Sequence, residues 1–321
     1  MQAPHIVLLG ATGFIGRAIV KQVAREDGSR RVSALIHRTR MNFDSNVVRP
    51  FYGSATALPA GLLADEPHVV IHCGSKQIDH DGCGFSENER GIEALCAAVN
   101  PHTRGILFAS SYSVYGDGPL RGVSEDCALQ PQSELARSRV ACEERLKRFA
   151  ESGTVSVAVL RARFVIGRGD RHFLPGLLKL ARRRVALADQ RQAFSVIDVD
   201  DYARVLLEMA RRCSIGDAPT ERFSAFNVGY ERAVSLAEIL EIVREIFQVD
   251  APRWRIPVRQ ALLRTLERLP SPQLRQIVHR IRLLGQDQYG ATGKLSAWLG
   301  QDWLRADPLL AVRRATIAML T

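Results

Sequence analysis

A short apolar segment near the start of the chain runs directly into three evenly spaced glycines. Residues 5–9 form a largely apolar run that predicts a buried strand, and apolar residues at 15, 19 and 23 then recur with helical spacing. Between them lies Gly-Ala-Thr-Gly-Phe-Ile-Gly over 10–16. Glycines at such a junction allow a tight turn and a close approach of the backbone to a phosphate, which the first N–H groups of the helix then face. This order of strand, glycine loop and helix predicts a dinucleotide-binding unit.

The alternation of strand and helix patterns continues through the first two thirds of the chain. Further buried strands are expected at 32–36, 69–71, 105–109 and 155–160. One long helix is expected at 133–152, before the last of these strands. Such alternation predicts an α/β fold with a Rossmann-type doubly wound parallel sheet that carries helices on both faces. We expect residues 1–163 to form the dinucleotide-binding core, completed by about 192–229.

The last third of the sequence has a mostly helical pattern. Its helices are expected at 235–247, 258–268, 272–284 and 306–320. A smaller, mostly helical C-terminal substrate lobe, built from 164–191 and 230–321, is therefore predicted. Within it, the stretch 253–282 contains eight arginines and a single acid, Glu267. This stretch either caps the substrate cleft with amphipathic helices, which we favour, or contacts a membrane surface.

Composition narrows the classes of protein and partner. The net charge is +10, and of the 44 basic residues only five are lysine and 39 are arginine. This excess reflects either GC-rich coding or an anionic ligand. No recognised nucleic-acid-binding motif accompanies it, so we do not expect nucleic acid as a partner. No apolar run approaches membrane-spanning length, no signal peptide is seen, and the six cysteines are scattered. We therefore expect a cytoplasmic protein with reduced thiols.

The residues after the second expected strand bear on the choice of cofactor. A dinucleotide site needs an acid there for a free ribose 2′-hydroxyl, or an arginine for a 2′-phosphate. The segment 34–40 has no acid, and Arg38 stands in the fitting place, with Arg17 and Arg40 as further cations. The alternative is that these arginines are solvated surface residues. We expect NADP as the cofactor in preference to NAD.

Several blocks along nearly the whole chain carry further motifs. They are Gly10 to Gly16, Val69 to Ser75, Asn88-Glu89-Arg90-Gly91, Ser110 to Gly116, Leu160-Arg161 with Gly167 to Asp170, Val199-Asp200-Asp201, and Phe226 to Gly229. Together they resemble the extended short-chain dehydrogenase/reductase family, which includes nucleotide-sugar epimerases, dehydratases and reductases. The resemblance implies a small-molecule substrate, which the basic charge suggests is anionic, and a homodimer. It places the cofactor contacts on Gly10, Thr12, Gly13, Phe14, Ile15, Gly16, Arg38, Cys73, Gly74, Ser75, Ser110 and Arg139.

The chain departs from this family where the family carries its chemistry, a Tyr-x-x-x-Lys pair. The matching stretch has Leu135 in the place of the tyrosine and Arg139 in the place of the lysine. Leucine has no exchangeable proton, and loss of a general acid or base costs about 10²–10⁴ in rate. Arg139 keeps a positive charge that suits the nicotinamide ribose, but its geometry differs from that of lysine. The remaining candidate catalytic residues are Ser111, which matches the family's active-site Ser/Thr, together with Tyr112 and Arg139.

Arg139 lies on a helical stripe that is otherwise apolar. The other members of the stripe are Leu135, Cys142, Leu146 and Phe149. A charge there should meet an anion or a set of acceptors, because an unpaired buried charge is costly. The alternative is a long side chain that reaches water.

Polar residues after the third expected strand offer a second source of acid/base groups. They are Lys76, Asp79, His80 and Asp81, and the alternative is a solvated loop. His72, Cys73, His80 and Cys83 lie nearby, but their spacing matches no standard zinc pattern, so we expect no metal.

Two functions are consistent with this sequence. The first is an NADP-dependent oxidoreductase or epimerase/dehydratase with atypical acid/base residues, acting on a polar carbonyl/alcohol or nucleotide-sugar-like substrate. The second is a catalytically silent dinucleotide-binding sensor or partner subunit. The fold serves both equally. We favour the enzyme because Ser111 and an elaborated C-terminal lobe are retained.

Overall fold

A seven-stranded parallel sheet forms the centre of the molecule. The computed structural model describes residues 4–26, 30–39, 47–79, 82–217, 219, 221–258, 278, 281–300 and 302–320. The strand order is β12-β7-β5-β4-β1-β2-β3, and every neighbouring pair in it is parallel. In that order the strands are β12 (Phe223–Val228), β7 (Ser156–Ala162), β5 (Thr103–Ser111), β4 (His68–His72), β1 (His5–Leu9), β2 (Val32–Ile36) and β3 (Val48–Tyr52).

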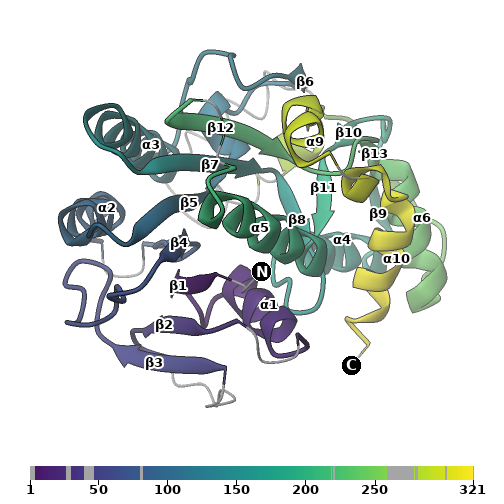
Figure 1. The fold of residues 1–321 in the computed structure, drawn as a ribbon. Coiled ribbons are helices and arrows are strands. Elements are labelled where there is room, and N and C mark those ends of the chain that lie inside the picture. The colour runs from purple at the N-terminus through teal and green to yellow at the C-terminus, as the bar shows by residue number, and fades with distance from the viewer. Residues whose placement is uncertain are drawn as a thin grey trace.

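Helices cover both faces of this sheet (Figure 1). One face carries α2 (Ser86–Ala98) and α3 (Glu134–Ser152), and the other carries α1 (Phe14–Val23) and α5 (Val199–Ser214). Side chains of a strand alternate between faces, so Val7 and Leu9 join the core under α2 and α3, whereas Ile6 and Leu8 join the core under α1 and α5. The predicted doubly wound α/β fold is thereby confirmed.

A smaller lobe packs beside the α1–α5 layer. Its described helices are α4 (Phe173–Arg182), α6 (Leu236–Phe247), α9 (Gly293–Leu299) and α10 (Pro308–Ile317), seen together in Figure 1. Core residues of α6 and α10, such as Leu236 and Val312, belong to the same apolar cluster as Ile6 of β1. The lobe therefore shares its core with the sheet, and the division near residue 163 stays a prediction.

The chain outside the central sheet contains more strand structure than expected. The short strands are β6 (Leu120–Val123), β8 (Phe164–Ile166), β9 (Val185–Leu187), β10 (Ala193–Phe194), β11 (Val196–Asp198), β13 (Val234–Ser235), β14 (Trp254–Ile256) and β15 (Gln288–Gly290). Strands of two to four residues are too short to show an alternating pattern. The expected helix at 258–268, and most of the one at 272–284, lie outside the described residues.

The structure adds one strand that was not predicted and corrects one predicted helix cap. The edge strand β3 was not predicted, because Pro50 and largely exposed side chains hide its pattern. The Val199-Asp200-Asp201 motif predicts that Asp200 or Asp201 caps the helix, but α5 is capped by Asp198, whose carboxylate accepts from the Asp200 N–H at 2.8 Å. Asp200 instead accepts a hydrogen bond from Lys21 Nζ at 2.8 Å. No helix among the described residues combines the length and apolarity needed to cross a membrane.

Candidate functional site

Backbone segments after β1 and β4 meet at the glycine loop. Gly10 has φ +91°, and a Cβ on it would lie 2.6 Å from the Gly74 Cα. A Cβ on Gly16 would lie 2.7 Å from the Ala11 Cα. Glycine at 10 thus allows the two strand ends to touch, and glycine at 16 lets α1 approach the strand. Gly16 does not line the neighbouring cavity, so its role is packing rather than direct contact with a ligand.

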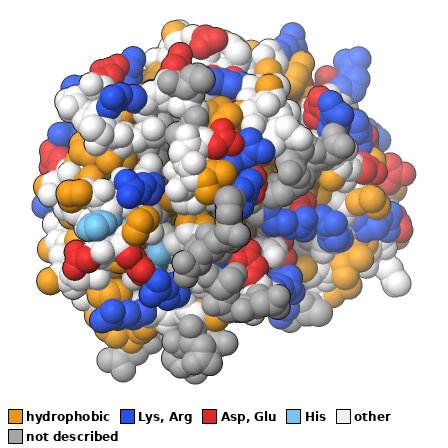
Figure 2. Space-filling view, in the orientation of Figure 1, with side chains coloured by type: hydrophobic (Ala, Val, Ile, Leu, Met, Phe, Trp, Pro, Cys, Tyr) orange, Lys and Arg blue, Asp and Glu red, His pale blue; other side chains and the backbone are white. Residues whose placement is uncertain are grey.

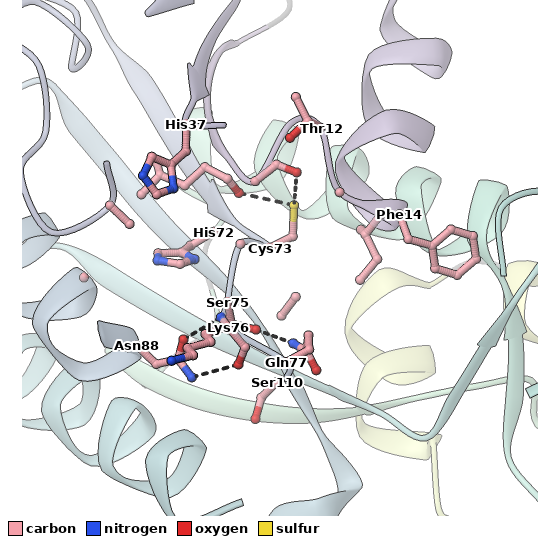
Figure 3. Close-up of a pocket in the computed structure, with 18 of the residues that line it drawn as sticks. Thr12, Phe14, His37, His72, Cys73, Ser75, Lys76, Gln77, Asn88 and Ser110 are labelled. Carbon is pink, nitrogen blue, oxygen red and sulfur yellow. Dashed lines mark hydrogen bonds between the residues drawn. The ribbon is translucent and has the colours of Figure 1, made fainter. Parts of the chain in front are cut away.

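The N-terminus of α1 opens onto a cavity of about 930 Å³, at the upper end of the range for cofactor and ligand sites. The helix begins after Gly13, and no side chain caps its first N–H groups. Thr12 lies on the loop beside Cys73, whose Sγ donates to the Leu9 carbonyl at 3.3 Å, and Phe14 begins α1 (Figure 3). The predicted cofactor residues that line this cavity are Gly10, Thr12, Gly13, Phe14, Ile15, Arg38, Cys73, Gly74, Ser75, Ser110 and Arg139. This arrangement fits a dinucleotide, because bare helix N–H groups and glycine backbone are what a pyrophosphate binds.

Arg38 lies near the edge of the sheet formed by β2 and β3, away from β5 and β7. It follows β2, is exposed, and lines the cavity with His37 and Thr39. Among the described lining residues, Glu87 is the one acidic side chain. The end of β2 therefore presents a cation and no carboxylate to the cavity.

Ser111 and Arg139 converge at the carboxyl end of β5. The Arg139 guanidinium donates to Ser113 Oγ at 2.8 Å and to Gln77 Oε1 at 2.5 Å. The Ser113 N–H donates to Ser111 Oγ at 3.3 Å. Burial lowers the pKa of Arg139 to about 10. The expected set of acceptors for Arg139 is present, and Ser111 lines the cavity beside it.

Tyr112 and Leu135 do not take part in the cavity wall. Tyr112 is fully buried and burial raises the pKa of its phenol. The chain turns at the 3₁₀ helix η1 (Tyr112–Tyr115), and the Tyr112 hydroxyl abuts Gly290, where an added Cβ would lie 2.6 Å away. Leu135 is half-buried and lies outside the lining residues. Tyr112 was a candidate catalytic residue, and the structure gives it no access to a substrate.

A buried ion pair lies directly behind Ser110. Arg161 of β7 binds Glu143 of α3 at 2.6 Å, with side-chain exposures of 5% and 2%. Glu143 also accepts from Ser110 Oγ, and Arg161 donates to the Tyr115 hydroxyl at 2.8 Å. Tyr115 in turn donates to Asn227 of β12 at 2.8 Å. The network joins the ends of β5, β7 and β12 and fixes the floor of the site.

Several lining residues were not identified as site residues from the sequence. Asn88 of α2 bonds both backbone groups of Lys76, accepting from its N–H at 2.7 Å and donating to its carbonyl at 3.2 Å (Figure 3). It thereby holds the 74–77 loop in place. Lys76 itself binds Asp79 at 2.8 Å. Lys76 and Asp79 thus pair with each other, while the other two loop candidates, 80 and 81, lie outside the described residues.

His72 and Arg163 are two further lining residues. Burial lowers the pKa of His72 to about 4, and its ring packs edge-on against Phe108 with centroids 5.6 Å apart. His72 is therefore neutral at neutral pH. Arg163 follows β7 and also projects into the cavity wall. The sequence indicated Arg163 only as a charged residue directly after an apolar strand.

The parallel sheet, the glycine cradle and the cavity at the strand ends define a Rossmann-type dinucleotide-binding protein. Residues 6–229 match the sequence model of the NAD dependent epimerase/dehydratase family, and the chain belongs to this family. The predicted relationship to the extended short-chain dehydrogenases/reductases is thereby confirmed.

Two curated relatives are identical to the chain at about a quarter of the aligned positions. A UDP-glucose 4-epimerase of Vibrio cholerae is 25% identical over 268 residues, which is 79% of this chain and 78% of the relative. A ceramide reductase of Caulobacter vibrioides is 26% identical over 66% of this chain and 62% of its own. The fold is similar to a UDP-galactose 4-epimerase structure, with TM-score 0.71, 21% identity and 98% of each chain covered. It is also similar to the structure of dTDP-glucose 4,6-dehydratase of Bacillus anthracis in complex with NAD, with TM-score 0.72 and 13% identity. The match covers 99% of this chain and 97% of that chain.

Proposed function

We propose that the protein is an NADP(H)-dependent oxidoreductase or epimerase/dehydratase-type enzyme acting on a polar carbonyl/alcohol or nucleotide-sugar-like substrate. The observation that carries the proposal is the glycine cradle of Gly10 and Gly74, which opens onto the same cavity as Ser111 and Arg139. Family membership supports a nicotinamide dinucleotide as cofactor, and the relatives' names include epimerases and a reductase.

The residues at the β5 end suit the handling of a substrate oxygen. When bound, a nicotinamide ring supplies or accepts hydride at the reacting carbon. Ser111 Oγ orients the substrate carbonyl or hydroxyl through a hydrogen bond. Arg139, held by Ser113 and Gln77, places a fixed positive charge where negative charge develops on that oxygen. His72 and Cys73 contribute shape rather than charge, since burial also raises the pKa of the Cys73 thiol to about 12.

Arg38 should determine the preference for the phosphorylated cofactor. A charge-assisted bond to a 2′-phosphate is worth about 1.5–3 kcal/mol, so NADP(H) should bind roughly ten- to a hundredfold more tightly than NAD(H). The Arg38→Ala variant should lose most of that ratio while keeping its affinity for NAD(H). Calorimetric titration of both cofactors into both proteins measures it. Arg25→Ala, at an exposed position just after the C-terminal end of α1, is the matched control. Tighter NAD(H) binding by the wild type would contradict the prediction.

A catalytically silent dinucleotide-binding protein is the second candidate function. The observation that favours it is the position of the phenols: Leu135 replaces the family's tyrosine, and Tyr112 is buried. Tyr202 does line the cavity, but its hydroxyl donates to the Leu160 carbonyl at 3.4 Å. Among the described lining residues, none presents a tyrosine hydroxyl free of another bond.

Restoring the family's pair distinguishes the two candidates. We expect Leu135→Tyr with Arg139→Lys to weaken ligand binding without restoring high turnover, because lysine cannot bridge Ser113 and Gln77 as the forked guanidinium does. Arg139→Ala should weaken cofactor or substrate binding clearly, and Leu135→Ala should weaken it less. Cofactor affinity and hydride transfer to a carbonyl panel are measured for the wild type, both single variants and the double variant. High turnover in the double variant alone would establish the silent protein.

A further inference from the structure

The described lining of the cavity carries more positive than negative charge. On the face shown in Figure 2, Lys and Arg side chains are interspersed with Asp and Glu. The charged side chains among the described lining residues are Arg38, Lys76, Arg139, Arg163 and Glu87. Lys76 is paired with Asp79, so three arginines remain to answer a ligand. Arg38 serves the cofactor end, which leaves Arg139 and Arg163 at the other end.

Arg163 is less well paired than Arg139, which Ser113 and Gln77 hold. Its Nε is shielded from solvent and has no hydrogen-bond partner, and the described part of the chain offers it no ion pair. Its guanidinium carbon lies 4.8 Å from the centre of the Phe164 ring. The acid whose charge it senses, Asp117, is bound to Arg282 at 3.1 Å. The side chain as a whole is only partly buried and lines the cavity, so a bound anion would supply the counter-ion that Arg163 lacks among the described residues.

Arg163 lies near Ser111 at the reacting end of the site, and the charge of Arg139 reaches it. Ser111 of β5 is in register with Ala162 of β7, so the Cα of Arg163 lies about 6 Å from that of Ser111 by strand geometry. Burial lowers the pKa of Arg163 to about 10, and the neighbouring Arg139 charge adds to this effect. From β1 to β7 there are three strand spacings, about 14 Å in all. An anion at Arg163 is therefore a different group from the pyrophosphate at the glycine loop.

We propose that Arg139 and Arg163 form an anion subsite that receives a carboxylate attached close to the reacting carbon of the substrate. The inference rests on the proposed function, in which Ser111 holds the substrate oxygen. A carboxylate is planar, and two guanidinium forks can bind its two oxygens in the same way that single forks bind it bidentately. The substrate class is then a hydroxy or oxo acid, or a sugar acid, rather than a neutral sugar.

The test titrates malonate, its neutral counterpart malonamide, and inorganic phosphate into the full-length protein, both alone and saturated with NADP. Calorimetry should show malonate binding to the wild type at least tenfold more tightly than malonamide, and more tightly than phosphate. Arg163→Gln and Arg139→Gln should each weaken malonate binding about ten- to a hundredfold. The Arg163→Lys variant keeps the charge but not the forked guanidinium. Its affinity for malonate should lie between that of the two glutamine variants and that of the wild type. Circular dichroism checks that each variant is folded.

Arg168→Gln is the matched control, because Arg168 is exposed in the turn after β8 and lies outside the lining residues. It should bind malonate as the wild type does. The subsite is overturned if malonate fails to bind, if malonamide or phosphate binds as well, or if folded Arg163→Gln binds malonate unchanged. The NADP titration reports separately on the proposed function: Arg163→Gln should keep NADP affinity within about twofold. Failure of the wild type to bind NADP would contradict the proposed function and leave the malonate result to decide the subsite.

Discussion

Replacing Glu143 with leucine is expected to lower the free energy of unfolding by about 3–5 kcal/mol, the usual cost of leaving one member of a buried ion pair without its partner. Arg161 would keep its charge with only 5% of its side chain exposed. It would retain the Tyr115 hydroxyl and the Glu125 carbonyl as acceptors, but neither is charged. Ser110 would lose its acceptor as well. The cost should therefore exceed that of an ordinary lost hydrogen bond.

Urea denaturation followed by circular dichroism measures this change, with Glu144→Leu as the matched control. Glu144 is the next residue on α3 and is exposed, so its replacement should change the free energy of unfolding by less than about 0.5 kcal/mol. The double variant Glu143→Leu with Arg161→Met should be more stable than Glu143→Leu alone, because no unpaired charge remains. A Glu143→Leu variant within 1 kcal/mol of the wild type would show that Arg161 finds another partner or water.

Strands, helices and turns that depend on residues close together in the sequence were predicted well. The five strands of the central sheet that were expected follow from short buried apolar runs, and α3 follows from a 3.6-residue period. The glycine loop was predictable because its three glycines stand between a strand and a helix. A local pattern of this kind also located Arg38 at a strand end, whereas Ser111 was located by the resemblance to the family; both line the cavity at the strand ends.

Contacts between distant segments were not predictable from such patterns. Arg161 and Glu143 lie on different elements, and nothing in either local sequence says that they face each other. Tyr112 looked available because it follows Ser111, but η1 turns its ring under Gly290 of β15, which belongs to the last part of the chain. Arg163 lies just beyond a strand, where neither strand nor helix periodicity assigns a direction to a side chain. Tertiary packing decides all three positions.

Gly10→Val should be the most damaging single change in the cofactor half of the site. Two costs add: a β-branched side chain at φ +91°, about 1–2 kcal/mol or more, and overlap with the Gly74 backbone, typically about 1–3 kcal/mol. The overlap cannot be relieved by rotating a side chain, because the opposing atoms are backbone. The loop must instead move away from the segment that follows β4, which displaces the N–H groups of α1 from the pyrophosphate position. We expect dinucleotide affinity to fall by at least about a hundredfold, corresponding to about 2.8 kcal/mol.

Thermal unfolding without ligand and calorimetric titration of NADP measure these two effects separately, the titration being made at a temperature where the variant is folded. Gly118→Ala is the control, since no atom lies within 4 Å of a Cβ added there. Gly10→Ala should show the same pair of effects at smaller size, because the alanine Cβ already meets Gly74. A folded Gly10→Val variant that binds NADP with wild-type affinity would mean that the dinucleotide does not depend on this loop. Because Gly10 and Gly74 join the ends of β1 and β4, that result would also remove the main support for placing the cofactor in the 930 Å³ cavity.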